Sequence, residues 1–245
     1  MDGRGARSSR VRSAVTDVLR NAGSRPAPIH RALVSLADRG AATTIVTTNF
    51  DKLLEAAARG QGKRLQSYAL GGIPRPGRSD EFAGVLHIHG VLGEQHRASD
   101  VIVTDQDFGE FYLRRRIVPD FIYDAARLFH LVLVGYNAND APMRYLLNAV
   151  AADGSRFDDL RERFAFVGMA PQIDPVAIED WKGRGITPIP YSASEQHIML
   201  GRTLKRWAEL SAINGRPGHV DSTLRRLIRT PRSGSTDSDR DLFDH

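Results

Sequence analysis

Residues 43–52 read TTIVTTNFDK. β-Branched residues fill the first six positions, which is typical of a strand, and the apolar helical pattern LLEAAA follows at residues 53–58. A strand that passes directly into a helix is the repeating unit of an open α/β sheet, where ligands bind at the carboxyl ends of the strands. The sequence therefore predicts a ligand-binding sheet edge at Asn49 and Asp51.

Asn49 and Asp51 differ in how well a purely structural role explains them. Asp51 can accept a hydrogen bond from the first free N–H groups of the following helix, and this capping role would explain it without any ligand. Asn49 is less easily explained in that way, because Asp51 is the better-placed cap. We therefore treat Asn49 as a candidate functional residue.

A second short strand is predicted at residues 85–90, which read VLHIHG. Since side chains alternate along a strand, His87 and His89 should lie on one face, and Gly90 allows a tight exit from the strand end. Two functional readings stay open for this pair, namely a metal site and a general base. A structural role for either histidine is the third alternative.

The third feature spans residues 130–142, HLVLVGYNANDAP. Its continuous apolar run is typical of a buried parallel strand. Asp140 is then predicted as a helix N-cap, with Pro142 near the first turn of a helix over residues 143–150. Helix starts also bind phosphate or ribose oxygens, so a ligand contact and a cap are both consistent with Asp140.

The rest of the chain alternates in the same way. Further strands are predicted at 101–103, 164–168 and 186–189, and helices at 11–19, 29–38, from 105 to a break at Pro119, at 121–129, 176–182 and 195–210. Thr104 and Asp107 form a capping-box pattern at the start of the helix from 105. Strands that alternate with helices over 150 residues predict an α/β fold with a doubly wound, mainly parallel sheet.

Composition sets limits on the class of protein. A chain of 245 residues can bury one sizeable core. It has no cysteine, which excludes disulfides and cysteine-built zinc modules. We find no apolar run of transmembrane length and no apolar segment of a secretory signal near the start, so we expect a cytoplasmic protein without membrane contact.

The net charge of +5 is concentrated in residues 1–39, which hold eight arginines and three aspartates. We expect a basic, flexible arm at 1–26, a folded domain at 27–213, and a polar, partly disordered tail at 214–245. The arm could contact nucleic acid through phosphate neutralisation. Alternatively, it is simply a solvated arm of an arginine-rich protein.

Four motifs occur in the order TTNFD (47–51), HG (89–90), TDQDF (104–108) and LVGYNAND (133–140). Together they resemble the sirtuin-like family, and more narrowly its prokaryotic branch associated with anti-phage defence. The resemblance covers residues 27–210. It implies a Rossmann-like, DHS-like NAD-binding fold, and NAD as substrate or ligand, with cleavage of the nicotinamide–ribose bond.

The resemblance also implies roles for particular residues. Asn49 would position the ribose or the attacking water, and His89 would act as general base on the ribose hydroxyls. Asp51 would help to hold the nicotinamide half of the dinucleotide, and Thr48 is a further expected cofactor-binding residue. Three further residues would lie near its ribose or phosphates: Gly135, Asn137 and Asp140.

Two features depart from the family pattern. The family begins with a strand and a glycine-rich turn that binds the pyrophosphate, whereas only 42 residues precede Thr43 and the glycines at 3–5 follow no apolar strand. The fold is therefore predicted to be N-terminally incomplete. Either the true start lies upstream, or the protein is a degenerate relative, or a second copy or a defence-system partner completes the site, since an incomplete sheet exposes a strand edge. The absence of cysteine also argues against the four-cysteine zinc module of many sirtuin deacetylases, so no zinc is expected.

Three functions remain open on the sequence. The first is an NAD+ glycohydrolase. The second is a catalytically degenerate NAD- or nucleotide-binding module, which the missing phosphate turn favours. The third is a metal hydrolase that uses His87, His89 and Asp140 as ligands.

Overall fold

The structure is a computed structural model that describes residues 10–11, 13–18, 23–37, 44–73, 84–91, 101–136, 141–153, 160–169, 172–211, 217–236 and 240. Its strands are β1 (Thr44–Thr47), β2 (Gln66–Ala69), β3 (Gly84–His87), β4 (Leu131–Leu133), β5 (Arg163–Met169) and β6 (Thr187–Ser192). Its helices include α2 (Pro28–Ala37), α3 (Leu53–Gly60), α4 (Asp105–Phe108), α5 (Ile117–Leu128), α6 (Ala141–Asp153), α7 (Pro175–Gly183), α8 (Ser194–Ser211) and α9 (Pro217–Arg229). Residues 10–11 and 13–18 are also helical, as predicted.

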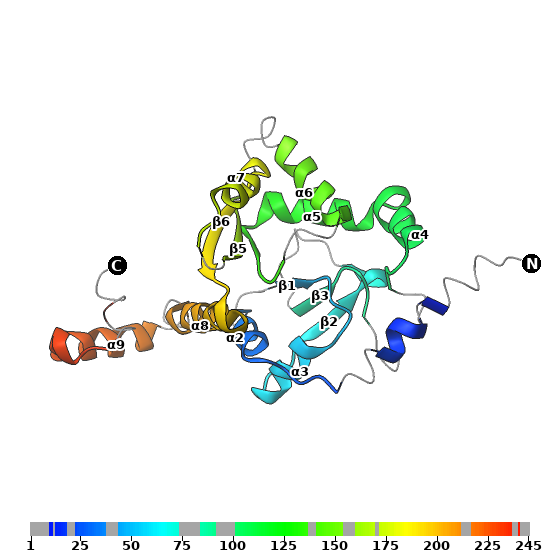
Figure 1. Ribbon diagram of the computed structural model, residues 1–245. Coiled ribbons are helices and arrows are strands. Elements are labelled where there is room, and N and C mark those ends of the chain that lie inside the picture. The colour runs from blue at the N-terminus through cyan, green and yellow to red at the C-terminus, as the bar shows by residue number, and fades with distance from the viewer. Residues whose placement is uncertain are drawn as a thin grey trace, which may run out of the picture.

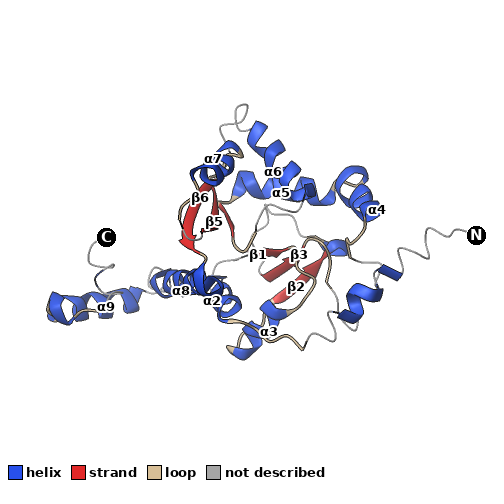
Figure 2. Ribbon diagram, in the orientation of Figure 1, coloured by secondary structure: helices blue, strands red, loops and turns tan. Residues whose placement is uncertain are grey.

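The strands form two parallel sheets (Figures 1 and 2). β3 lies between β1 and β2 in the first sheet, and β5 lies between β4 and β6 in the second. Every strand pair is parallel, which confirms the predicted α/β class with parallel strands. Among the described residues, however, the two sheets stay separate, because no strand of one sheet pairs with a strand of the other.

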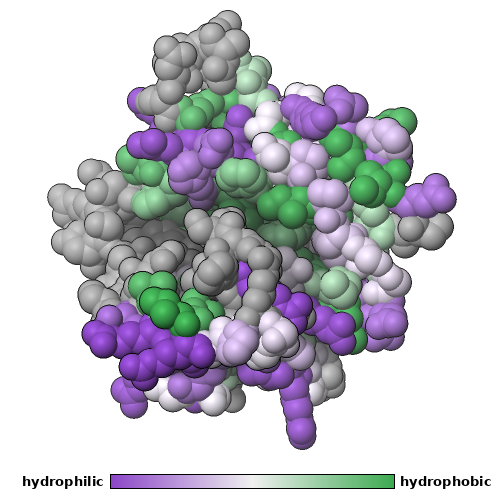
Figure 3. Space-filling view, turned by 90° about the vertical axis from the view of Figure 1, so that its left-hand side faces the viewer, coloured by the Kyte–Doolittle hydropathy of each residue, from purple (hydrophilic) through white to green (hydrophobic). Residues whose placement is uncertain are grey.

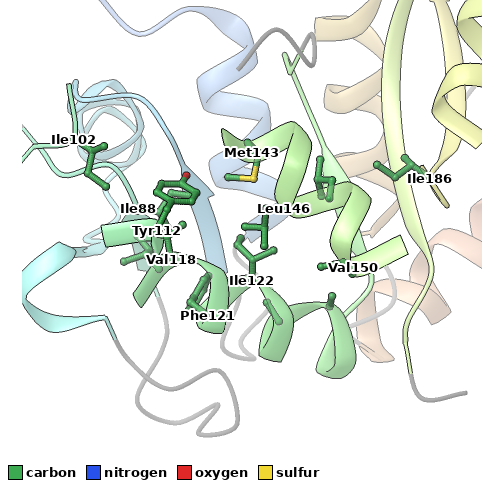
Figure 4. Close-up of a cluster of buried hydrophobic side chains, with 14 of the residues drawn as sticks. Ile88, Ile102, Tyr112, Val118, Phe121, Ile122, Met143, Leu146, Val150 and Ile186 are labelled. Carbon is green, nitrogen blue, oxygen red and sulfur yellow. The ribbon is translucent and has the colours of Figure 1, made fainter. Parts of the chain in front are cut away.

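Helices cover both faces of the two sheets. On β3, Val85 packs in a cluster with α2 and α3, whereas Leu86 packs in the large cluster that includes α5 and α6. Side chains of neighbouring strand residues point to opposite faces, so the two helical layers lie on opposite sides of the sheet. Ala165 of β5 belongs to the same large cluster as Leu86, part of which is drawn in Figure 4. The two sheets therefore share a core.

Helices α2 and α8 cover the other face of the second sheet. Phe166 of β5 packs with Ala32 of α2 and with Leu200 and Leu204 of α8. Outside this cluster, some apolar side chains of α8 stay exposed, among them Ile198 and Met199. Figure 3 shows a face on which hydrophobic residues gather near the centre and hydrophilic residues lie along the lower edge.

Two local predictions were wrong. Residues 101–103 form no strand; Val101 and Ile102 are buried, and the Ile102 N–H donates to the carbonyl of His89 at 2.8 Å. The helix that begins after Thr104 breaks at Arg116, which has a left-handed φ of 55°, rather than at Pro119. Pro119 lies in the first turn of α5, where its missing N–H costs no intrahelical hydrogen bond.

Other predictions were confirmed. Thr104 and Asp107 form the expected capping box, and the helix then continues through a π-helical segment, η3 (Gly109–Arg114). The strand predicted near residues 131–134 exists as β4, although its residues are only half-buried. The half-burial follows from its position at the edge of its sheet. Within the described part of the chain, no helix combines the length and the apolar character that a membrane crossing requires.

The last part of the chain contains a helix that the sequence analysis did not predict. α9 spans Pro217–Arg229 inside the segment expected to be a polar tail. α8 is irregular near its start, because Glu195, Gln196 and His197 have positive φ values. His197 is exposed and its ring nitrogen Nδ1 lies 2.7 Å from the hydroxyl of Tyr191.

Candidate functional site

The exit from β1 is fixed by short hydrogen bonds. The Asn49 N–H donates to Oγ1 of Thr47 at 3.1 Å, and the Leu53 N–H donates to Oδ1 of Asp51 at 3.0 Å. Asp51 therefore satisfies a free N–H group at the start of α3, which is the capping alternative named for it. Asn49 is exposed, and Thr48 is half-buried.

His87 ends β3 and has no exposed surface. Its Nδ1 lies 2.9 Å from the carbonyl oxygen of Asn49, and its Nε2 lies 2.9 Å from Oε1 of Glu55 on α3. Both ring nitrogens are therefore engaged by the protein. This arrangement removes His87 as a metal ligand, and no group of three or more metal-binding side chains occurs in the described parts of the chain.

Glu55 is the charged partner of this cluster. Its carboxylate Oε1 also accepts a hydrogen bond of 2.5 Å from the hydroxyl of Ser67 on β2. Burial acts to raise the pKa of Glu55, but the hydrogen bonds from His87 and Ser67 and the charge of His87 outweigh burial, so the pKa lies below its usual value. Glu55 is therefore an ionised carboxylate near neutral pH, although only 5% of its surface is exposed.

His89 lies outside β3, in the turn that follows it. The Gly90 N–H donates to the carbonyl of His87 at 3.0 Å, and Gly90 has a φ of 91°, a conformation that favours glycine. The strand thus ends at His87, whereas it was predicted to extend to residue 90. As a result, the prediction that one continuous strand carries both histidines was wrong, because β3 carries only His87.

The surroundings of His89 are aromatic. Its Nε2 lies 2.6 Å from the hydroxyl of Tyr112 in η3, and its ring meets the rings of Phe108 and Tyr112 edge-on at centroid distances of 5.8 and 5.9 Å. Only 6% of His89 is exposed. Tyr112 also belongs to the large apolar cluster (Figure 4), so the core holds the hydroxyl that orients the His89 ring.

The register of the first sheet relates the two candidate catalytic residues. Thr47 of β1 is paired with His87 of β3. Asn49 and His89 each lie two residues beyond these paired ends, so both leave the same carboxyl edge of the sheet. Neighbouring carboxyl strand ends are where open α/β sheets bind ligands.

The second sheet contributes the exit from β4. Gly135 is exposed and has a φ of 69°, and a Cβ added there would meet none of the described atoms within 4 Å. Its backbone is therefore open to close approach. Tyr136 follows and meets Trp181 of α7 edge-on. The other two residues predicted near this strand end, Asn137 and Asp140, lie outside the described residues.

Sequence reasoning missed Glu55, Ser67 and the hydroxyl of Tyr112. Glu55 had a usable signal, because it interrupts an otherwise apolar helical stretch, LLEAAA, and a charge on an apolar helix face needs a buried partner. Ser67 had none. The aromatic residues of the 105–117 segment pack in or against the core, yet their sequence positions do not reveal that Tyr112 contacts a histidine.

A family model described as "SIR2-like domain" matches residues 43–189. The chain belongs to the SIR2-like domain family. The match covers the segment from β1 into β6, including both strand exits, and so confirms the sirtuin-like resemblance drawn from the motifs. Proteins of this family are generally related to NAD.

One relative of this SIR2-like domain is the uncharacterized protein y4cA of Sinorhizobium fredii. The two are 34% identical over 224 residues, which cover 82% of this chain and 18% of the relative. The chain therefore spans less than a fifth of the length of the relative that it matches.

Proposed function

We propose that this SIR2-like domain binds NAD+ at the carboxyl edge of its first sheet and cleaves the bond between nicotinamide and ribose. The observation that carries the proposal is the paired exit of Asn49 and His89, each two residues beyond the matched strand ends Thr47 and His87. An exposed amide and an oriented imidazole leave one sheet edge together. This is the pair of groups that the reaction requires in order to hold a ribose and a water molecule.

The reaction itself demands positioning more than a strong nucleophile. NAD+ and water give ADP-ribose, nicotinamide and a proton: the bond from the nicotinamide nitrogen to the ribose C1′ breaks, and a bond from the water oxygen to C1′ forms. The transition state resembles an oxocarbenium ion, so holding ribose and water in line supplies much of the rate enhancement. Asn49 provides the exposed amide for this purpose.

His89 is the proposed general base on the ribose hydroxyls. The hydroxyl of Tyr112 at 2.6 Å from Nε2 and the edge-on ring of Phe108 fix the orientation of the imidazole. A base held in this way loses little rotational freedom when the substrate binds. An imidazole also titrates near neutral pH, which suits a general base.

The remaining contacts divide between the two strand exits. Thr48 and Asp51 follow β1 and would hold the nicotinamide side, Asp51 while also capping α3. Gly135 leaves the end of β4 open for the approach of a ribose or phosphate. Asn137 and Asp140 are proposed for the same region on the sequence motif alone.

The setting of the domain is also a proposal. We propose that it spans residues 27–213 and works in a prokaryotic anti-phage defence system, as the sequence resemblance implies. The open edges of β1 and β4 within the described residues could pair with a strand from a second copy or from a partner protein. The basic arm is the proposed contact for nucleic acid, if the protein has one.

One observation favours a second candidate, a binding module without turnover. His89 is 6% exposed and its Nε2 is engaged by Tyr112, so the ring must become more accessible before it can act as a base.

Calorimetric titration with NAD+ and a fluorescence assay of nicotinamide release distinguish the two candidates. We expect weak binding with slow release by the 245-residue chain, and loss of release in Asn49→Ala. Binding without any release would favour the binding module. Absence of NAD+ binding at millimolar concentration would contradict both candidates.

A further inference from the structure

The cluster formed by His87, Glu55 and Ser67 lies directly beneath the exposed Asn49. The Asn49 carbonyl oxygen can only accept, so Nδ1 of His87 must carry a proton to form the 2.9 Å contact. With a protonated ring, His87 and Glu55 form a buried ion pair through the second 2.9 Å contact. The ring then bridges a carboxylate and a main-chain carbonyl.

Glu55 depends on this contact. Its Oε2 is buried and has no hydrogen-bond partner among the described residues, so the interactions of Oε1 with His87 and Ser67 compensate the carboxylate charge. A buried ion pair of this kind adds little net stability compared with apolar residues, but it holds its partners in one geometry. The pair therefore suits a positioning role.

The main chain of Asn49 is held on both sides. Its N–H donates to Oγ1 of Thr47 at 3.1 Å, and its carbonyl accepts from His87 at 2.9 Å. These two bonds restrain the peptide groups that flank the Cα atom, and with them the direction in which the side chain leaves the backbone. The side chain itself is exposed, so the backbone contacts are the described interactions that orient it.

We propose that His87 is a positioning residue: through Nδ1 it fixes the Asn49 carbonyl, with Glu55 as its counter-ion, and thereby aims the Asn49 amide at the ribose and water. The proposal rests on the proposed function in assigning that task to Asn49. It assigns no substrate contact to His87, whose surface is fully buried. It differs from a purely structural role, in which His87 serves only to satisfy Glu55.

Two matched substitutions separate these roles. An asparagine at position 87 places its amide nitrogen near the position of Nδ1 and keeps a donor for the Asn49 carbonyl, but it loses the contact with Glu55. A glutamine reaches the position of Nε2 and keeps a donor for Glu55, but it loses the contact with Asn49. Both substitutions remove the imidazole ring and insert an amide into the same buried space.

The proposal predicts that activity and stability change in opposite directions. His87→Gln should be the more stable of the two because Glu55 keeps a donor, yet its kcat for nicotinamide release should fall by about tenfold or more, as expected for a misplaced reacting group. His87→Asn should melt at a lower temperature, but below that temperature it should keep kcat within a few-fold of the natural protein. If activity follows stability in both variants, the positioning role is overturned.

A second measurement does not require turnover. The carbonyl-carbon chemical shift of Asn49 reports the hydrogen bond that this carbonyl accepts. It should stay near its natural value in His87→Asn and move in His87→Gln. Equal shifts in the two variants would overturn the proposed anchor, whereas absence of nicotinamide release by the natural protein would overturn only the proposed function.

Discussion

His87 and His89 are two residues apart, but they occupy opposite kinds of environment. The region around His87 is ionic and polar: Glu55, Ser67 and the Asn49 carbonyl engage a ring with no exposed surface. The region around His89 is aromatic, and the hydroxyl of Tyr112 lies 2.6 Å from its Nε2. The first region joins β3 to β1 and α3, whereas the second joins the β3 exit to α4 and η3.

The difference arises because the strand ends between the two histidines. Alternation along a strand would have placed both side chains on one face of the sheet, but β3 ends at His87 and His89 lies in the turn that follows. His87 is therefore held between strands and α3, whereas His89 lies beyond the strand end and packs against α4 and η3. The two histidines therefore differ in role: His87 supports the scaffold, and His89 is the candidate catalytic residue.

The largest effect should come from His89. Replacing it with alanine should reduce nicotinamide release by roughly 10²–10⁴-fold, which is the usual contribution of a general base. The folded state should persist, because the remaining aromatic contact between Phe108 and Tyr112 is retained. Initial rates and a thermal melt, measured on one preparation, would check both expectations.

Tyr112→Phe is the matched control for His89→Ala. It removes only the hydroxyl that contacts Nε2 and should lower the rate by a smaller factor. If the rate of His89→Ala equals that of the natural protein, His89 is not the base. The aromatic region around His89 would then not hold the catalytic base.

Loss of Glu55 should chiefly affect stability. Glu55→Ala leaves the His87 imidazole buried without its carboxylate, and removing one partner of a buried ion pair costs about 3–5 kcal/mol in the free energy of unfolding. Urea denaturation would measure this cost. Glu179→Ala breaks an exposed contact with Lys182 and should cost at most about 1 kcal/mol; equal losses in the two variants would mean that the buried pair has no special role.

The pH dependence of stability tests the ionised state of Glu55. Because the pKa of Glu55 is lowered in the folded protein from its usual 4.5, its contribution to stability is complete above about pH 4.5 and is lost as the pH falls through the folded value. Glu55→Gln should therefore flatten the acid side of the curve of unfolding free energy against pH. An unchanged acid side would show that the buried carboxyl is not ionised.

Glu110 is a control for Glu55, because its pKa is lowered by contacts with arginines at the surface rather than by buried partners. Hydrogen bonds from Arg114 and Arg115 hold the pKa of this exposed carboxyl at about 2. Its effect should shrink at high salt, because solvent ions screen exposed charges. The effect of the buried Glu55 should persist under the same conditions.

The smallest expected effect concerns the helix that carries the His89 partners. Thr104→Ala removes the N-cap of α4 and should lower the free energy of unfolding by about 1 kcal/mol. The rate should fall slightly, since α4 and η3 hold Phe108 and Tyr112 against the ring. A rate loss as large as that of His89→Ala would mean that the helix itself, rather than the imidazole, supports the activity.

The sequence was a good guide where the signal is local. The β-branched run of residues 43–48 predicts β1, the Asp51 cap follows from its place before a helix, and the capping box at Thr104 is visible in the order of residues. Each depends on neighbours within a few positions. Hydrogen bonds between residues this close in sequence can be predicted from the order of residues alone.

The remaining features depend on contacts that are distant in sequence. Glu55 meets His87 across 32 residues, and Tyr112 meets His89 across 23 residues. The division of the strands between two sheets and the turn at residues 88–90 likewise result from packing and from hydrogen bonds between elements. Periodicity alone could not reveal that the two histidines have different partners.

The most direct test follows the histidine rings during titration with NAD+. In the chain with isotope-labelled histidine, assigned by His87→Asn and His89→Ala, the ring signals of His89 should move and saturate as NAD+ is added. Those of His87 should stay near their positions throughout. Saturable shifts at His87 with none at His89, or no shifts at either ring despite binding, would contradict the assignment of the ligand to the His89 side of the sheet edge.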